Sequence, residues 1–286
     1  MLVSSLTCHD HVPMAIQCLG SLQRLSQANV RLQIHDDGSL TDDDAQELEQ
    51  RLKPCRVVSR AEADERMATL LAHYSWARWL RDRWPLALKL FDCFLLNDRD
   101  LLAFSDADIL YMRPFVSMFE LPPGNTTNAV FMEDKVDAYC LRSWQKLLSR
   151  RVTLPSRVNI GLFCFRKAHF DLDYLDWFVG ERRHYGIPNH IAQGALAALG
   201  RRVGCRKYDP RQVRVMREGE NIDGLVAGHF TARTRRLLPW YVEQSQRAAL
   251  TEEPVKLRTV PAGSCTAFDL ARFELRRLIS SVGRTS

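Results

Sequence analysis

The sequence contains no uninterrupted apolar run of about 18 residues, the length that a membrane-spanning helix requires. Its first ten residues, MLVSSLTCHD, also lack the basic segment and the long apolar stretch of a secretory signal peptide. These absences argue against an integral membrane protein and a secreted one. We therefore expect a cytoplasmic protein without a membrane span.

Closely spaced cysteines are also missing, because none of the eight cysteines forms a CxxC pair. Disulfide-rich domains and zinc sites cluster their cysteines, so this scatter argues against both. Single cysteines within apolar stretches are typical of buried, reduced thiols. They are Cys8, Cys18, Cys55, Cys93, Cys140, Cys164, Cys205 and Cys265.

Internal repeats and low-complexity tracts are absent as well. The 286 residues are 46% apolar and 26% charged, which excludes collagen, coiled-coil and disordered proteins. A net charge of +6 suggests an anionic partner. However, the chain shows no basic recognition helix and no interleaved basic and aromatic motif. We therefore expect no nucleic-acid partner, although a nucleic-acid-binding protein remains an alternative.

Apolar runs and helical periodicity alternate along the chain. This alternation predicts an α/β fold with a mostly parallel sheet flanked by helices. The segment 201–260 is interpreted as basic and irregular. Strands are predicted at 2–6, 30–34, 56–59, 101–105, 129–132 and 160–165, and helices at 16–25, 42–52, 61–83, 85–96, 141–150, 173–184, 189–199 and 267–280.

Two acidic clusters follow predicted strands, one at Asp36 and Asp37 and the other at Asp106 and Asp108. Ligands bind beyond the carboxyl ends of the strands in such sheets. Because side chains alternate along an extended chain, Asp106 and Asp108 would share one side. A hard cation such as Mg²⁺ or Mn²⁺ would relieve their repulsion. The alternative is a solvated turn without a ligand.

Several segments of residues 1–240 occur in an order that resembles a known family. They are Asp36-Asp37-Gly38-Ser39, the helix residue Lys89, Phe104-Ser105-Asp106-Ala107-Asp108, Asn159-Ile160-Gly161, Asn189-His190-Ile191-Ala192-Gln193 and Gly228-His229-Phe230. In this order they resemble the GT-A class of nucleotide-sugar glycosyltransferases, particularly the glycogenin-like and lipopolysaccharide-glycosyltransferase-like members. The resemblance implies a Rossmann-like GT-A fold with a small C-terminal extension.

The resemblance also implies an activity, which is metal-dependent transfer of a hexose from a nucleoside-diphosphate sugar to a hydroxyl acceptor. A UDP-sugar is the favoured donor, Mn²⁺ or Mg²⁺ the cofactor, and a saccharide or lipid-linked molecule the acceptor. Asp106, Asp108 and His229 are the expected metal ligands. Contacts to the nucleotide and its phosphates are expected from Asp36, Asp37, Lys89, Asp106, Arg235 and Arg236. A non-catalytic nucleotide-sugar-binding protein is the other alternative.

Activation of the acceptor stays open at the level of sequence. An inverting enzyme needs a general base, and Glu133 and Asp134 follow a predicted strand where such a base could stand. A retaining enzyme needs no such base and would use Gln193 or Asn159 near the anomeric carbon. The loop Thr7–His11 could frame the nucleobase. Four aromatic residues at helical spacing, Tyr74, Trp76, Trp79 and Trp84, could stack on sugars or belong to the core.

The charge is concentrated in residues 201–236, which hold ten basic and four acidic residues and so carry the whole net charge of +6. This concentration predicts local handling of phosphate near His229. We expect a GT-A domain over 1–240, with a nucleotide-binding half at about 1–114 and an acceptor half at about 115–240. A helical extension follows at 241–286. Within it, the basic amphipathic segment 268–280 could dock on the domain or contact the inner face of a membrane.

Overall fold

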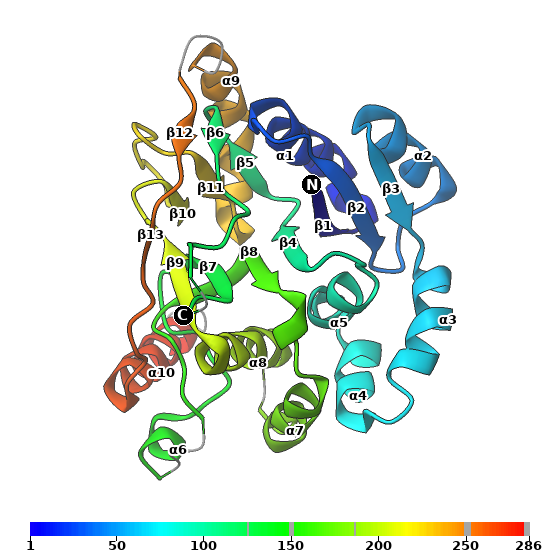
Figure 1. Ribbon diagram of the computed structural model, residues 1–286. Coiled ribbons are helices and arrows are strands. Elements are labelled where there is room, and N and C mark those ends of the chain that lie inside the picture. The colour runs from blue at the N-terminus through cyan, green and yellow to red at the C-terminus, as the bar shows by residue number, and fades with distance from the viewer. Residues whose placement is uncertain (125, 149–151, 186, 249–252, 283–286) are drawn as a thin grey trace.

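The computed structural model describes residues 1–124, 126–148, 152–185, 187–248 and 253–282. Figure 1 shows a central sheet that lies between helices on its two faces. The sheet has the strand order β13-β9-β7-β8-β4-β1-β2-β3. Its strands are β1 (Leu2–Thr7), β2 (Arg31–Asp36), β3 (Cys55–Val58), β4 (Leu101–Ser105), β7 (Ala129–Glu133), β8 (Val158–Arg166), β9 (Cys205–Tyr208) and β13 (Thr259–Pro261).

The half of the sheet around β1 is parallel, since β1 pairs in parallel with both β2 and β4 and β2 pairs in parallel with β3. In the other half, β8 is antiparallel to β4 and β7, whereas β7 and β9 are parallel. The predicted α/β class with a mostly parallel sheet is confirmed. The carboxyl ends of β1, β2 and β4 consequently meet at one edge, as doubly wound sheets require for a ligand site.

Helices cover both faces of this sheet (Figure 1). They are α1 (Val12–Leu25), α2 (Asp42–Arg51), α3 (Arg60–Leu70), α4 (Ser75–Arg83), α5 (Leu88–Leu95), α6 (Ser143–Leu148), α7 (Leu172–Arg182), α8 (Pro188–Val203), α9 (Leu238–Ala248) and α10 (Ala267–Val282). Among the described residues, no helix combines the length and the apolar character that crossing a bilayer would take.

The alternation of side chains along the central strands builds a separate core on each face. On β4, Leu102 and Phe104 belong to the core that contains the α5 residues Phe91 and Phe94. The intervening Ala103 belongs to the opposite core, which packs against α1 and α2. Strands buried on both faces read as continuous apolar runs, which explains why β4 was predictable from its composition.

Two small sheets accompany the central one. The first has the order β10-β11-β5, with β5 at Ile109–Tyr111, β10 at Val213–Val215 and β11 at Ala227–His229. The second pairs β12 (Val255–Lys256) with β6 (Phe115–Val116). Because β5 begins directly after the Asp106–Asp108 loop, its antiparallel pairing with β11 carries a late part of the chain to this loop.

The single helix predicted at 61–83 is two helices, α3 and α4. The first turn of α4 is capped by a distant side chain: the backbone amides of Trp76 and Ala77 both donate to the Asp176 carboxylate of α7, at 2.8 Å each. A helix N-terminus needs acceptors for its free amides. Since the acceptor comes from another helix, the local sequence gave no sign of this break.

The segment 201–260 is not irregular, as was predicted, because it holds the four strands β9 to β12, the start of β13 and the helix α9. The strand β9 has the sequence CRKY, in which basic side chains conceal the apolar alternation. Arg206 donates to Thr259 of β13, and Lys207 pairs with Glu133 at 2.5 Å. These tertiary partners make a polar strand compatible with burial. Through β13, the expected C-terminal extension adds an edge strand to the central sheet.

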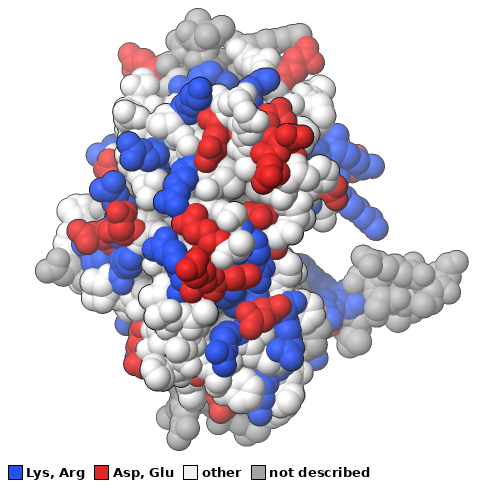
Figure 2. All heavy atoms as spheres, turned by 90° about the vertical axis from the view of Figure 1, so that its right-hand side faces the viewer, with Lys and Arg blue, Asp and Glu red and all other residues white. Residues whose placement is uncertain are grey.

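All eight cysteines are free thiols, and five of them are buried. Figure 2 shows that basic and acidic side chains interleave on the face formed around α2 and α3. Ion pairs explain part of this pattern, since Arg56 contacts Glu62 at 2.5 Å and Arg60 contacts Asp64 at 2.7 Å. Acidic side chains therefore interrupt the basic ones on this face.

Candidate active site

A pocket of about 570 Å³ opens at the carboxyl ends of β1 and β4. Its wall comes from the loop after β1, from the turn Pro85–Ala87 before α5, from the Asp106–Asp108 loop, from β8 and α8, and from the segment after β11. The volume lies within the range of small-molecule sites. The pocket also stands where ligands bind in open α/β sheets.

Asp106, Asp108 and His229 meet in this pocket with their ligand atoms within 4.8 Å of one another. The Nε2 atom of His229 lies 2.9 Å from Asp108 Oδ1 and 3.6 Å from Asp106 Oδ2. The strand register explains this arrangement, because His229 is paired with Ile109, the residue after Asp108. The Asp106 backbone amide donates to the Gly161 carbonyl at 2.7 Å, which ties the loop to β8.

Two cations balance the carboxylates. Lys89 Nζ lies 2.6 Å from Asp106 Oδ1, and Arg235 places Nε and Nη2 at 2.9 and 2.8 Å from Asp108 Oδ2. Burial alone would raise the pKa of Asp108, but His229 and Arg235 hold this pKa well below its usual range. For Asp106 burial dominates, so its pKa is raised despite Lys89. The pocket thus keeps at least one firmly ionised carboxylate beside an imidazole.

The donor set of this triad fits a divalent cation. Two carboxylate oxygens and one imidazole nitrogen converge. Carboxylate oxygens suit Mg²⁺ and Mn²⁺, and imidazole is a common metal ligand. The other ring nitrogen of His229, Nδ1, is buried without a hydrogen-bond partner among the described side chains. Gly161 keeps the space open, since a Cβ there would lie 2.6 Å from His229 Cε1. The expected ligands Asp106, Asp108 and His229 could therefore hold the metal.

Two amide side chains line the pocket and share one carboxylate. Asn159 Nδ2 and Gln193 Nε2 donate to Asp134 Oδ2 at 3.0 and 3.4 Å. Gln193 Nε2 also donates to the Ala138 carbonyl at 3.1 Å, and the Asn159 oxygen accepts from the Gly161 amide at 2.7 Å. These bonds fix which end of each amide is nitrogen. Asn159 and Gln193 line the pocket, while Asp134 stands behind them.

The remaining predicted residues divide between the pocket and other places. Asp37 lines the pocket, whereas Asp36 accepts from the backbone amides of Gly38, Leu40 and Arg60 and so shapes the turn. Glu133 pairs with Lys207 and with Arg157, outside the pocket wall.

Arg235 and Arg236 point to different partners. Arg235 lines the pocket, but the exposed Arg236 contacts the Glu218 carboxylate at 2.9 Å. Of the ten basic residues in 201–236, Arg235 alone lines this pocket. The local handling of phosphate predicted for this segment therefore stays a prediction that rests on Arg235, because the other nine basic residues do not line the pocket. Arg206 bonds to Thr259, for example, and Arg211 to Asp209.

The loop Thr7–His11, which was expected to frame the nucleobase, contributes Thr7, Cys8 and His11 to the pocket wall. His11 Nε2 lies 3.1 Å from Arg235 Nη1. Trp84, one of the four aromatic residues that could stack on sugars, lines the pocket and is 37% exposed, and sequence reasoning missed its neighbour Leu86, which is 44% exposed. The other three aromatic residues of that set, Tyr74, Trp76 and Trp79, pack against the core. The helical spacing of the set did not show which of its members would line the pocket.

No family model matches the sequence, and no curated protein matches it. Among solved structures, the galactosyltransferase LgtC, in complex with donor and acceptor sugar analogues, has a TM-score of 0.55 and 12% identity, covering 88% of this chain and 98% of that chain. Mouse xyloside xylosyltransferase 1 has a TM-score of 0.53 and 11% identity, covering 82% and 98%. The glycosyltransferase GlyE of Streptococcus pneumoniae has a TM-score of 0.52 and 10% identity, covering 84% and 59%.

At these identities the likeness shows the fold. The chain has the GT-A fold of these glycosyltransferases, and the resemblance predicted from its motifs is confirmed.

Proposed function

We propose that this protein is a metal-dependent glycosyltransferase that moves a hexose from a nucleoside-diphosphate sugar to a hydroxyl acceptor. One observation carries the proposal, which is the convergence of Asp106, Asp108 and His229 at the ligand-binding edge of a GT-A sheet. The fold alone hosts many activities, so the site has to carry the argument. The relation of the fold to LgtC and to a xylosyltransferase adds support.

The chain supplies charges suited to a leaving diphosphate. A Mn²⁺ or Mg²⁺ ion held by the triad would act as a Lewis acid on the phosphate oxygens. Arg235 offers a planar guanidinium that matches phosphate bidentately, and two of its nitrogens already contact one oxygen, Oδ2, of Asp108. Lys89 is buried beside Asp106 and holds that carboxylate in place. Both cations stabilise negative charge that develops as the glycosidic bond breaks.

The amide cluster favours a retaining reaction. Asp134 Oδ2 already accepts from two amide donors, so this carboxylate orients Asn159 and Gln193 rather than facing the acceptor. Gln193 Nε2 donates to Asp134 and to the Ala138 carbonyl. The side-chain oxygen of Gln193 is therefore directed away from these two acceptors. In this proposal the Gln193 oxygen stabilises the oxocarbenium-like carbon, and Glu133 is a structural ion-pair residue.

The open rim of the pocket is the acceptor side. Trp84 is partly exposed there, and an aromatic ring that is half in water suits the apolar face of a sugar ring. Asp37 and the Thr7–His11 loop are the groups for the nucleotide, for which a uridine diphosphate sugar is the favoured donor. The acceptor in this proposal is a saccharide or a lipid-linked molecule.

Calorimetric titration of UDP and GDP, with and without Mn²⁺, tests the proposal. We expect metal-dependent binding of one nucleotide, weakened at least about 100-fold in Asp108→Asn, since a charged metal ligand becomes a neutral amide. The matched control is Asp98→Asn, because Asp98 is a highly exposed carboxylate outside the pocket that contacts its neighbour Arg99. Equal binding by Asp108→Asn, or no binding of either nucleotide to the wild-type protein, would refute it.

A further inference from the structure

Large exposed apolar side chains gather on two helices at one end of the molecule. Eleven such side chains are exposed among the described residues, and five of them belong to α6 and α10. We call these five the apolar platform: Trp144, Leu147, Phe268, Leu275 and Ile279. Their exposed fractions run from 58% to 74%. Contiguous exposed apolar groups on a folded protein mark interaction surfaces.

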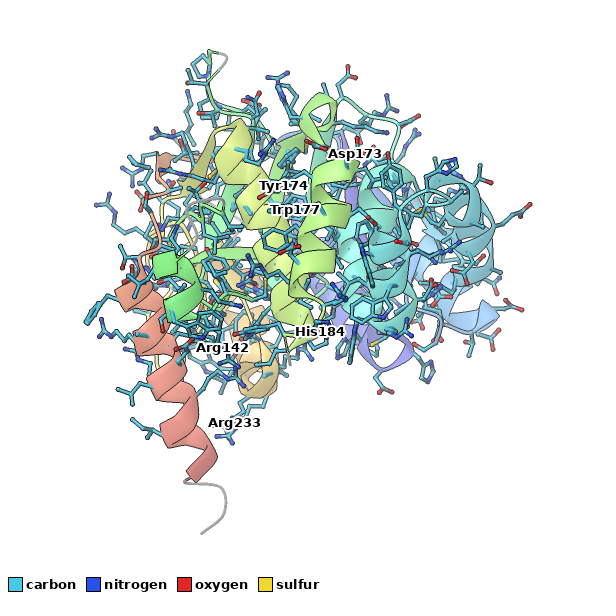
Figure 3. All side chains as sticks on the ribbon, turned by 90° about the horizontal axis from the view of Figure 1, so that it is seen from below. Arg142, Asp173, Tyr174, Trp177, His184 and Arg233 are labelled. Carbon is cyan, nitrogen blue, oxygen red and sulfur yellow. The ribbon has the colours of Figure 1, made fainter. Side chains whose placement is uncertain are left out.

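The two helices lie side by side. Both the Ser143 backbone amide and its hydroxyl donate to the Glu274 carboxylate, at 3.1 and 3.0 Å, which joins the start of α6 to the middle of α10. Figure 3 shows α6 against α10, with Arg142 beside them, and shows α10 projecting beyond the body of the protein. The platform is therefore formed by exposed side chains of two joined helices.

The helix α10 has two apolar sides, and the structure uses only one for docking. Leu270 is fully buried, and the Phe273 ring lies 5.5 Å from the His190 ring of α8. Phe268, Leu275 and Ile279 are spaced by seven and four residues, which at about 3.6 residues per turn places them together on the opposite side. If α10 had docked on the domain through this side, as the sequence allowed, these side chains would be buried. The side chain of Leu278 lies outside the described residues.

Charge distinguishes between the possible occupants of this surface. Arg272 and Arg276 are exposed on α10. Its two acidic residues are engaged within the protein, since Asp269 accepts from Thr266 at the start of the helix and Glu274 accepts from Ser143. The outer side of α10 therefore combines apolar side chains with arginine. This is the composition of a helix that lies in the interface of an anionic bilayer.

We propose that the apolar platform docks on an anionic phospholipid bilayer, with Arg272 and Arg276 at the headgroups and Leu275 and Ile279 among the acyl chains. The inference is independent of the glycosyltransferase proposal, because it rests on α6 and α10 alone. Together the two proposals favour a lipid-linked acceptor, since α10 packs on His190, the neighbour of the pocket residue Asn189.

Flotation with vesicles tests the proposal on the full chain. We expect binding to vesicles of phosphatidylcholine mixed with phosphatidylglycerol and little binding to phosphatidylcholine alone. Leu275→Ser with Ile279→Ser should lower the partition coefficient at least about tenfold. Arg272→Gln with Arg276→Gln should lower it roughly fivefold for each arginine and reduce its dependence on salt.

The matched control is Leu70→Ser with Arg78→Gln, which changes an exposed leucine and an exposed arginine on α3 and α4. This variant should bind like the wild-type protein. The proposal would be overturned if the wild-type protein did not bind the anionic vesicles. It would also be overturned if the variant with Leu275→Ser and Ile279→Ser bound them as well as the wild-type protein does. Sedimentation that shows a dimer which this variant dissociates would overturn it too, because a second copy of the chain would then be the occupant. The arginine variant keeps the test valid if the serine variant does not fold.

Discussion

Gly161→Ala is a small change at the centre of the candidate active site. A Cβ at this position would lie 2.6 Å from His229 Cε1 and 2.8 Å from both Asn159 Oδ1 and Asp106 Oδ2. Ordinary contacts begin near 3.5 Å, so these atoms would have to move by about 0.7 to 0.9 Å. None can withdraw freely: Lys89 holds Asp106, and the Gly161 amide itself holds the Asn159 oxygen.

The substitution should therefore affect binding more than folding. Overpacking costs about 1–3 kcal/mol of unfolding free energy. A shift of about 1 Å in positioned groups can cost up to about 100-fold in rate. We expect Mn²⁺-dependent nucleotide binding to weaken at least about tenfold, which corresponds to about 1.4 kcal/mol. Urea denaturation measures the unfolding free energy, and calorimetric titration measures the nucleotide affinity.

Two other glycines provide controls for this experiment. At Gly228 an added Cβ would meet Met216 Sδ at 2.7 Å, the flexible part of a side chain that can move, so Gly228→Ala should cost less binding. At Gly20, within α1, the nearest atom is Leu52 Cδ2 at 3.6 Å, and alanine should stabilise the helix by about 1 kcal/mol. Wild-type stability and nucleotide affinity in Gly161→Ala would show that the triad tolerates displacement, contrary to our reasoning.

Three further predictions follow from other contacts. Asp92→Ala should lower the unfolding free energy, measured by urea denaturation, by about 3 kcal/mol. The reason is that the buried Arg81 loses a bidentate carboxylate partner, whose oxygens lie 2.8 and 2.7 Å from its nitrogens. A loss below about 1 kcal/mol, typical of exposed ion pairs, would contradict this. Burial, with Arg56 and Arg66, lowers the pKa of His35 from 6.5 to about 3, so the folded state binds fewer protons and stability should fall as pH drops from 6.5 towards 3. A His35→Gln protein should show a shallower slope, and an unchanged slope would assign the effect elsewhere. Asp134→Asn should reduce kcat strongly while thermal stability changes little. The new amide group replaces the carboxylate that accepts from Asn159 and Gln193, so these two side chains lose their orientation. An unchanged kcat with a changed melting temperature would reject the positioning role of Asp134.

Much of the fold was predictable because its central strands are unusually apolar. The strand β4 is buried on both faces, and its five residues LLAFS are followed directly by Asp106. Thr41 and Asp44 form a capping box at the start of α2, a purely local signal. Such patterns act within a few residues, so sequence reasoning reaches them. The polar strand β9 and the break before α4 escaped it, because their partners lie on β13 and α7.

The sequence by itself determined the α/β architecture, the place of the acidic loop at a strand end and the types of residue that could bind a metal. Only the tertiary structure decided which candidates meet. The strand β11 pairs with β5 and brings His229 to Asp108. Glu133 instead forms an ion pair with Lys207, and Arg236 forms one with Glu218. The tertiary structure also decided that the Leu275 side of α10 faces outward. The physical reason is that strand register and helix packing join residues far apart in the chain, and these long-range contacts leave no periodic trace in the sequence.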